Sequence, residues 1–310
     1  MASNGNPQVE KALQADGSPA AEGASRKAAL ARAGDPGAFT PAGAPGGAGG
    51  PSSRGNLFTV RGLRFAYGDN VIFDGLDLTL REGVVTTLIG ANGSGKTTLF
   101  NLLTKQLRPQ AGSVYLRRGN VAYIGLRDFA RLVAIVHQNN VAPADLPVSK
   151  LVRYGREPYH GLGQVASTTE DDAMVKWALE TCDLAAFSDV PVALLSGGQR
   201  QRAWIAMALA QGARVLLLDE PTTYLDVRYQ LDILRLVKCL NRKFGLTVVM
   251  ILHDINQSLH YSDEIVALSG GRIVAQGAPE QVVTPELVRR VYGVDLGITQ
   301  VEGKPFVLAV

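Results

Sequence analysis

A glycine-rich octapeptide placed between a strand and a helix is the feature that most constrains the fold of this 310-residue chain. It reads Gly-Ala-Asn-Gly-Ser-Gly-Lys-Thr at positions 90–97 and follows Val84–Ile89, a continuous run of residues that favour β-strands. Apolar residues at helical spacing come next, until Arg108 and Pro109: Leu99, Leu102, Leu103 and Leu107. Glycines in this setting let backbone N–H groups and a helix N-terminus converge on phosphate oxygens. The segment predicts the first βα unit of a parallel sheet, with a nucleotide phosphate site at its end.

Each residue type in this loop has an expected task. Lys96 is long enough to reach the β- and γ-phosphates, and Thr97 can place its hydroxyl on Mg²⁺. The other residues that we expect to contact the nucleotide are Gly90, Asn92, Gly93, Ser94, Gly95 and Thr98. The pattern therefore predicts a site for ATP and Mg²⁺.

Two carboxylates follow a second apolar run. Val215–Leu218 has the composition of a buried strand, and Asp219 and Glu220 come directly after it. Open α/β sheets bind ligands at the carboxyl ends of their strands. We expect Asp219 to hold Mg²⁺ and Glu220 to polarise the attacking water, since a metal-bound nucleotide needs one carboxylate for each task.

A second helix start of the anion-binding kind lies upstream of these carboxylates. Leu195 is followed by Ser196, Gly197, Gly198 and Gln199, and then by a helix of small residues that ends near Gly212. A serine and two glycines place unpaired backbone N–H groups at a helix N-terminus. Two such helix starts in one chain suggest that a nucleotide is held from two sides.

The rest of the chain predicts three further parts. Residues 1–55 contain 36 Ala, Gly, Pro or Ser residues and are expected to be disordered, whereas residues 56–310 form one ATPase domain. Short antiparallel strands are expected over 57–80, broken at 68–70 and at 74–75, and a helical subdomain over about 139–212. Buried strands at 214–218 and 246–252, with helices at 230–244 and 256–261, complete an α/β fold of the P-loop type with a parallel sheet core.

Composition excludes several classes of protein. The net charge is +3, and basic residues occur in pairs rather than runs, so no nucleic-acid partner is expected. Two distant cysteines, Cys182 and Cys239, form neither a disulfide framework nor a metal cluster and suggest a reducing compartment. Without an apolar run of about 18 residues or a signal peptide, the chain is expected to be intracellular, or held at a membrane by a partner.

The motifs, taken in order, resemble the ATP-binding subunit of ATP-binding-cassette (ABC) transporters. The resemblance rests on 90–97, Gln138, 195–199, 215–220, Leu225 with Asp226, and His253. It implies a homodimer in which the Ser196–Gln199 segment of one subunit contacts the γ-phosphate held by the loop of the other.

The resemblance also implies roles for single residues. Tyr67 would stack on adenine, and Gln138 would touch the metal and the attacking water. Asp226 would cross the dimer interface, while His253 would bond the γ-phosphate and align Glu220. With Lys96, these assignments give four catalytic residues, Lys96, Gln138, Glu220 and His253, and three metal contacts, Thr97, Gln138 and Asp219.

Four further segments resemble importers of ferric siderophores, with haem and cobalamin importers close by. They are 154–160, 219–226, 253–258 and the ending at 283–294. This implies a peripheral subunit at the cytoplasmic face of the membrane, a membrane permease and, through it, a substrate-binding protein. The alternatives are a soluble cassette ATPase acting on nucleic acid, a nucleotide-binding module without hydrolysis, and an exporter.

Overall fold

A mixed sheet of six strands is the framework of the computed structural model, which describes residues 55–160, 168–301 and 304–308. The strand order is β10-β9-β3-β8-β7-β6. Neighbours from β9 to β6 pair in parallel, and β10 pairs antiparallel with β9 at the edge. The strands span Val85–Ile89 (β3), Val133–Val136 (β6), Val215–Leu218 (β7), Thr247–Ile251 (β8), Glu264–Ser269 (β9) and Arg272–Gly277 (β10). The predicted parallel core of an α/β fold is thus confirmed.

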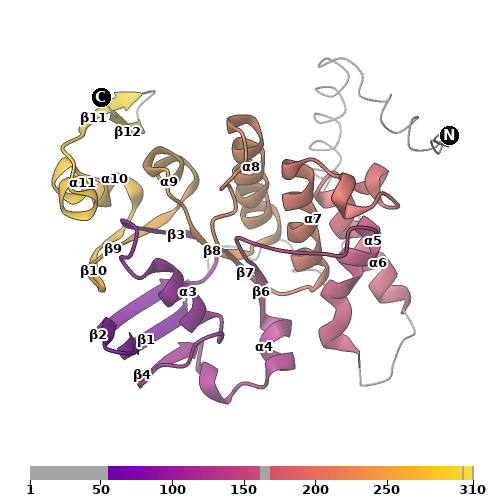
Figure 1. The fold of residues 1–310 in the computed structure, drawn as a ribbon, viewed down its shortest axis with the longest axis horizontal. Coiled ribbons are helices and arrows are strands. Elements are labelled where there is room, and N and C mark those ends of the chain that lie inside the picture. The colour runs from indigo at the N-terminus through magenta and orange to yellow at the C-terminus, as the bar shows by residue number, and fades with distance from the viewer. Residues whose placement is uncertain (1–54, 161–167, 302–303, 309–310) are drawn as a thin grey trace, which may run out of the picture. The chain divides into compact units, whose positions relative to one another are not determined.

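Both faces of this sheet are covered, as continuous apolar strands require. Leu216 and Leu218 of β7 point to a core shared with helices α5–α8, whereas Val215 and Leu217 point to a core shared with helix α3 and a second sheet. Figure 1 shows these two layers on opposite sides of β7 and β8. The helices span Lys96–Leu103 (α3), Val148–Arg153 (α5), Thr169–Thr181 (α6), Gly197–Ala210 (α7) and Val227–Phe244 (α8).

The second sheet is antiparallel, as predicted, but its strands are longer than expected. Its order is β2-β1-β4-β5, with bounds Asn56–Tyr67 (β1), Asn70–Arg81 (β2), Ala111–Leu116 (β4) and Gly119–Asn120 (β5). The predicted break at Asp74 and Gly75 is wrong. Leu63 pairs with Leu76 and Arg64 with Asp74, so Gly75, with φ +84°, is the extra residue of a bulge.

Helix α3 is one turn shorter than predicted. It ends at Leu103, where the Thr104 hydroxyl donates to the carbonyl of Phe100 and Lys105 takes the left-handed conformation with φ 65°. Leu107 therefore leaves the helix and packs, partly buried, against the core under the second sheet. Leu107 continues the helical spacing of the leucines in the sequence, but the turn after α3, and not the helix, brings it to the core.

The middle of the chain is helical, in agreement with the sequence. Besides α5, α6 and α7 it contains the 3-10 helices Tyr154–Tyr159 (η2), Ala185–Phe187 (η3) and Val192–Leu194 (η4). Within the described residues of 139–194, the only β pairing is an isolated bridge between Pro147 and Pro191. The segment predicted to be disordered, 1–55, lies outside the described residues except for Gly55. The domain limits at 56 and 310 stay a prediction.

The remaining elements flank the main sheet at its two edges. Before β6 lie Val121–Tyr123 (η1) and Leu126–Leu132 (α4). After β8 lie Ile255–Tyr261 (α9), Pro279–Val282 (α10), Pro285–Tyr292 (α11) and the hairpin of Gly297–Val301 (β11) with Lys304–Leu308 (β12). A third apolar cluster joins α9, α11 and Val307 to Ile89, the last residue of β3. The C-terminal segment therefore packs directly beside the glycine-rich loop.

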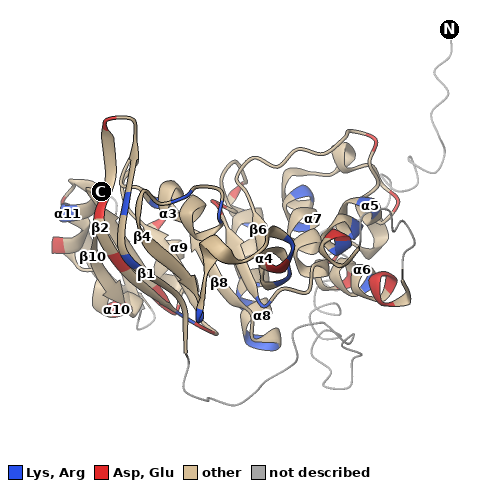
Figure 2. Ribbon diagram, turned by 90° about the horizontal axis from the view of Figure 1, so that it is seen from below, with Lys and Arg blue, Asp and Glu red and all other residues tan. Residues whose placement is uncertain are grey.

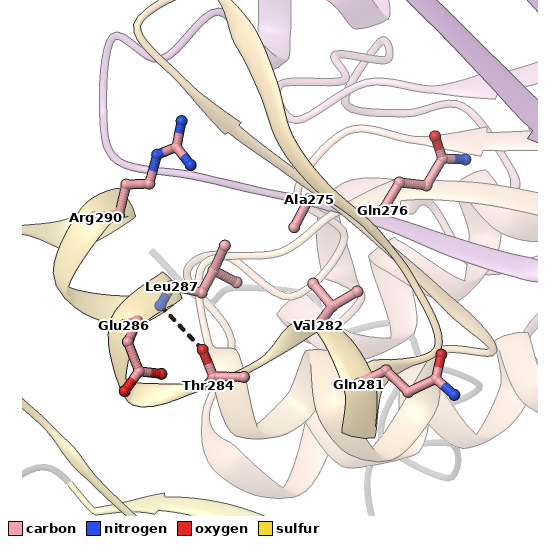
Figure 3. A pocket seen from close by; sticks show the side chains of 8 residues that line it. All are labelled: Ala275, Gln276, Gln281, Val282, Thr284, Glu286, Leu287 and Arg290. Atoms are coloured by element: carbon pink, nitrogen blue, oxygen red, sulfur yellow. Dashed lines mark hydrogen bonds between the residues drawn. The ribbon is translucent and has the colours of Figure 1, made fainter.

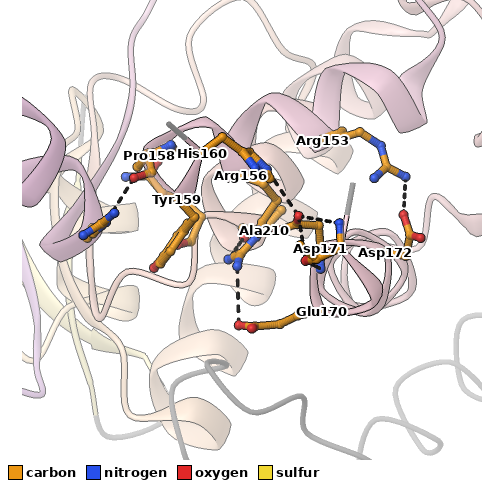
Figure 4. Close-up of polar contacts among 12 residues, drawn as sticks. Arg153, Arg156, Pro158, Tyr159, His160, Glu170, Asp171, Asp172 and Ala210 are labelled. Carbon is orange, nitrogen blue, oxygen red and sulfur yellow. Dashed lines mark hydrogen bonds and ion pairs between the residues drawn. The ribbon is translucent and has the colours of Figure 1, made fainter. Parts of the chain in front are cut away.

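A buried arginine joins the elements of the helical insert (Figure 4). Arg156 is 3% exposed, and its Nε lies 2.7 Å from Oδ1 of the equally buried Asp171 on α6. Its Nη1 donates to the carbonyl of Ala210 at the end of α7, and its guanidinium stacks on Tyr159 at 4.0 Å. Around this pair, the charged residues of α5 and α7 are all basic, whereas those of α6 are mostly acidic (Figure 2). Arg156 thus fixes η2, α6 and α7 relative to one another.

The carboxyl group of Asp171 is adapted to this partner. Burial alone would raise its pKa, but hydrogen bonds from Arg156 and Thr168, with the Arg156 charge, bring the pKa down to about 2. Because this pKa lies below the unfolded value, the ionised form stabilises the fold above about pH 4, and the contribution is lost as pH falls towards 2.

Replacing Arg156 should destabilise the protein strongly. Arg156→Met leaves the Asp171 charge buried without its partner, and we expect unfolding to become easier by about 3–5 kcal/mol at pH 7. Denaturant unfolding measures this difference, which should shrink between about pH 4 and pH 2. Arg153→Met on the preceding turn is the matched control, because its ion pair with Asp172 is half exposed and worth at most about 1 kcal/mol. An equal loss of unfolding free energy in both variants would contradict the stabilising role given to the buried pair of Arg156 and Asp171.

Candidate functional site

Four neighbouring strands end at one edge of the main sheet, and the candidate catalytic residues follow them. Across the order β3-β8-β7-β6, the strands lead into the glycine-rich loop, His253, the pair Asp219 and Glu220, and Gln138. Along the chain these groups occur in a different order, with Gln138 second and His253 last. Parallel pairing therefore assembles them, because the carboxyl ends of parallel strands lie at the same edge.

The loop from Gly90 to Gly95 is tightly built around its glycines. A Cβ at Gly90 would lie 2.5 Å from the Leu268 carbonyl oxygen, and one at Gly95, where φ is +102°, would lie 2.8 Å from the Phe73 ring. Neither position accepts a side chain. The Lys96 ammonium lies inside the loop and donates to the carbonyl oxygens of Gly90 (2.8 Å) and Ala91 (3.0 Å). A phosphate group would offer this cation oxygen acceptors of opposite charge in place of neutral carbonyls.

The charged groups of the site influence one another, and two of them, Lys96 and Asp219, are buried. Burial lowers the pKa of Lys96, while the nearby Glu220 and Asp219 oppose that shift. Burial raises the pKa of Asp219, and Glu220 raises it further; His253 and Lys96 act against this, and the result is about 6. These mutual effects place Lys96, Asp219, Glu220 and His253 within one electrostatic environment.

The Glu220 carboxylate is held by three side chains. Its Oε1 lies 2.5 Å from His253 Nε2, and its Oε2 accepts hydrogen bonds from Gln138 Nε2 (2.6 Å) and Thr223 Oγ1 (3.0 Å). Its backbone has φ 50°, a left-handed conformation that costs a non-glycine residue about 1–3 kcal/mol. Both features fix the direction of the carboxylate at the sheet edge.

The residues present fit a hydrated divalent cation beside a phosphate. Two buried oxygen atoms, Ser94 Oγ and Asp219 Oδ1, have no hydrogen-bond partner among the described residues. Buried polar groups are normally satisfied, so such atoms point to a ligand or water. Thr97 and Gln138 are exposed at the same edge and offer further oxygen atoms, which are the ligands that Mg²⁺ prefers. The predicted metal contacts are therefore chemically consistent with the structure.

The Ser196–Gln199 segment begins helix α7 but is not part of this cluster. Ser196 and Gln199 form a reciprocal capping box, and a Cβ at Gly198 would lie 2.3 Å from the Tyr229 ring. Figures 1 and 2 both place α7 with α5 and α6, on the other side of β7 and β8 from α3. Asp226 caps α8 by accepting from the Tyr229 N–H. Both motifs are locally ordered without contributing to the Glu220 cluster of their own chain.

Tyr67 stands apart from the catalytic groups. It ends β1 and is 49% exposed, with its ring against the edge of Phe65 at 4.9 Å. A ring exposed to this extent is not a core residue, and its face is available for stacking.

Three residues near the site were not predicted to have roles. Thr223 binds Glu220, as described, and its hydroxyl three positions after the glutamate is a signal that could have been used. Tyr292 of α11 lies by the loop: burial raises its pKa to about 12, and the Gly90 backbone amide opposes that rise. His137, for which the sequence offered no role, packs on Phe100, contacts Gln106, and has a pKa lowered by burial.

A shallow pocket lies elsewhere, on the C-terminal side of the main sheet (Figure 3). It is lined by β10, α10 and α11, with Gln276, Thr284 and Arg290 among its residues. None of the predicted site residues lines it. This pocket is therefore separate from the candidate site at the sheet edge.

The chain is similar in sequence to known proteins. A family model described as ABC transporter matches residues 73–223. The chain is 42% identical over 244 residues to the Bacillus subtilis (strain 168) iron(3+)-hydroxamate import ATP-binding protein FhuC, covering 78% of this chain and 90% of FhuC. It is 40% identical over 248 residues to the Escherichia coli (strain K12) ferric enterobactin transport ATP-binding protein FepC, covering 79% and 91%.

Solved structures give the same result for the fold. The cbiO1 protein of Clostridium perfringens, part of the ABC transporter complex cbiONQ, superimposes with a TM-score of 0.67 at 28% identity, over 76% of this chain and 94% of cbiO1. The ADP conformation of MJ1267, an ATP-binding cassette of an ABC transporter, superimposes with a TM-score of 0.69 at 24% identity, over 77% and 99%.

The raised pKa of Asp219 predicts that its ionised carboxylate lowers the stability of the folded protein. Because the folded pKa of about 6 exceeds the ordinary 3.8, the folded state binds this proton more tightly, and ionisation above pH 6 favours unfolding. Asp219→Asn should therefore stabilise the metal-free protein at pH 7.5 by about 3 kcal/mol. The gain should shrink as pH falls from 6 to 4.

Denaturant unfolding in a chelator measures this gain. Asp145→Asn, at an exposed position, is the matched control and should leave stability unchanged. A loss of stability in Asp219→Asn would show that the carboxylate is favourably solvated in the folded protein.

Proposed function

This chain belongs to the ABC transporter family and is an ATPase of it, and on that premise we propose that its ATP hydrolysis powers import of a ferric siderophore through a membrane permease. FhuC and FepC, which it matches over most of their length, are named for import of iron(3+) hydroxamates and transport of ferric enterobactin. Residues 56–310 are the catalytic domain in this proposal.

The environment of Glu220 is the observation that carries the hydrolytic part. A general base must be ionised, oriented and within reach of a water molecule. Gln138, Thr223 and His253 hold both carboxylate oxygens, and the group is only partly buried, so water can reach it. Glu220 accepts the proton of the attacking water, while His253 keeps the carboxylate in line.

Lys96 and the loop amides supply the electrostatic part of catalysis. Phosphoryl transfer depends on positioning and on stabilising the charge of the transferred group. Lys96 is already buried beside the loop and next to two carboxylates, so exchanging its carbonyl partners for phosphate oxygens needs little movement. Asp219, Thr97 and Gln138 would hold Mg²⁺, which would neutralise phosphate charge.

The active unit in this proposal is a homodimer. Within one chain, helix α7 lies on the other side of β7 and β8 from helix α3, which begins at Lys96 (Figure 1). Ser196, Gly197 and Gly198 present a capped helix N-terminus that suits a phosphate. A second copy, related head to tail, brings this helix end to the γ-phosphate of the first. Asp226 lies at that interface, and Tyr67 stacks on the adenine.

The permease contact in this proposal lies on the segments before and after Gln138 in the sequence. Three apolar side chains there are strongly exposed, Tyr123 (88%), Leu126 (75%) and Val141 (90%). Exposed apolar groups of this size mark interaction surfaces when they gather in one region. No described helix is both long and apolar enough to cross a bilayer. In this proposal the subunit docks on the permease at the cytoplasmic face of the membrane, and a substrate-binding protein delivers the cargo to the permease.

Glu220→Gln should stop turnover while keeping nucleotide bound. The amide cannot accept the proton, so the phosphate-release rate should fall at least about a hundred-fold. ATP should then hold the variant as a dimer, which light scattering detects. Glu180→Gln, an exposed carboxyl on α6, is the control and should hydrolyse ATP at the parent rate. Parental turnover in Glu220→Gln would refute the assignment of the base.

Uptake in cells tests the cargo. Cells in which this chain is replaced by Glu220→Gln are given radiolabelled ferric hydroxamate, ferric enterobactin, haem and cobalamin in parallel. We expect loss of uptake for a ferric siderophore and unchanged uptake of the other two. If only the uptake of haem or cobalamin is lost, the proposal that the cargo is a ferric siderophore is wrong, while the proposal that the chain powers import stands. Unchanged uptake of all four, together with ATPase activity stimulated by DNA or RNA, would overturn both.

A further inference from the structure

Two glutamines join the helix after His253 to the loop before Asp226. Gln257 on α9 donates from Nε2 to Oε1 of Gln230 on α8 at 2.6 Å, and Gln230 donates from its own Nε2 to the carbonyl oxygen of Leu225 at 2.8 Å. The two hydrogen bonds run in the same direction and link three segments that are separate in sequence. They form a continuous relay from α9 to the loop.

Both ends of this relay are fixed by the backbone. The Gln257 N–H donates to the side chain of Asp254, the residue next to His253, and the Gln230 N–H donates to the Asp226 carbonyl. The side-chain oxygen of Gln257 is buried without a hydrogen-bond partner among the described residues. The amide of Gln257 is therefore kept in a costly environment, where the bond to Gln230 orients it.

At its loop end, near Leu225, the relay contacts the Ser196–Gly198 start of helix α7. In the proposed homodimer this helix start binds the nucleotide held by the other subunit. A Cβ at Gly197 would lie 3.3 Å from Leu225 Cδ2, so the leucine side chain packs on Gly197. Tyr229, one turn into α8, lies so close to Gly198 that no Cβ fits there. A shift of Leu225 must therefore move or release the Ser196–Gly198 segment, because packed side chains do not deform continuously.

We propose that Gln230 and Gln257 are positioning residues that couple the state of His253 to the Ser196–Gly198 helix start of the same subunit. This rests on the proposed function, because in the homodimer His253 serves the subunit's own ATP and the helix start serves the other ATP. The relay therefore links hydrolysis at one site to phosphate contacts at the second. Neither glutamine touches nucleotide, and their effect is on cooperativity between sites.

Steady-state hydrolysis by the full-length chain tests the relay. We expect Gln230→Leu and Gln257→Leu each to bring the Hill coefficient for Mg-ATP down to about one and to lower kcat about two- to ten-fold, the loss expected for one hydrogen bond. The double variant should lose no more than either single one, because both break the same connection. Binding of a fluorescent ADP analogue to the monomer should stay unchanged, which a merely unfolded or loosened domain would not allow.

Two variants protect the test against simple misfolding. Arg242→Ala, at an exposed position of α8, should keep the parental Hill coefficient and kcat. In Gln257→Glu the new carboxylate is an acceptor only, so the Gln230 amide can donate to this carboxylate or to the Leu225 carbonyl, and one of the two hydrogen bonds of the relay is lost. This variant should therefore behave as the leucine variants do. Adding Gln230→Lys supplies one cation that can donate to both acceptors, so the pair should restore cooperativity.

The outcomes separate this inference from the proposed function. Parental Hill coefficients in both leucine variants, a coefficient of one in the parent protein, or failure of the Lys–Glu pair to restore cooperativity would overturn the relay. Absence of ATP hydrolysis in the parent would instead overturn the proposed function. Loss of cooperativity with restoration by the pair supports the relay.

Discussion

Parallel pairing of β3, β8, β7 and β6 is the constraint on which the site depends. Each strand is buried on both faces, so its register is set by two separate apolar cores and not by the residues that follow it. Lys96, His253, Glu220 and Gln138 come together because four strand ends do. A slip of one residue in β7 would exchange Leu216 and Leu217 between the two cores. The precision of the catalytic cluster therefore derives from apolar packing on either side of the sheet.

The same edge of the sheet also contains several features that lower the stability of the folded chain. Asp219 is buried beside another carboxylate, Glu220 adopts a left-handed backbone, and Lys96 is desolvated within the loop. None of these features stabilises the chain without its ligands. The buried charges of Asp219 and Lys96 would become favourable if a multiply charged phosphate and a cation bound, because these would supply the missing opposite charges. The site is thus preorganised for its ligand at the expense of stability, and the well-packed sheet beneath it tolerates that cost.

Local signals in the sequence predicted the strand and the helix around the glycine-rich loop better than they predicted the edges of the fold. The strand, glycine loop and helix around Lys96 lie within twenty residues, so the pattern alone identifies them. Helix α8 starts three residues earlier than predicted, since Asp226 acts as its N-cap. Strands β10 and β11 are half exposed or exposed along most of their length and lack the apolar alternation that would reveal them. The contact between Gln230 and Gln257 joins residues 27 positions apart, and no sequence pattern indicates it.

The strength of the contacts around the site determines which parts can move. Arg156 forms a buried ion pair with Asp171 and donates a hydrogen bond to the Ala210 carbonyl, which makes η2, α6 and α7 a rigid group that resists rearrangement. The links to the catalytic cluster are weaker and more exposed. Gln138 reaches Glu220 through one amide hydrogen bond, and each step of the glutamine relay is also a single bond. A phosphate or water molecule can replace bonds of this kind at little net cost. Ligand binding is therefore expected to move the helical insert as a body, with the change concentrated at Gln138 and along the relay.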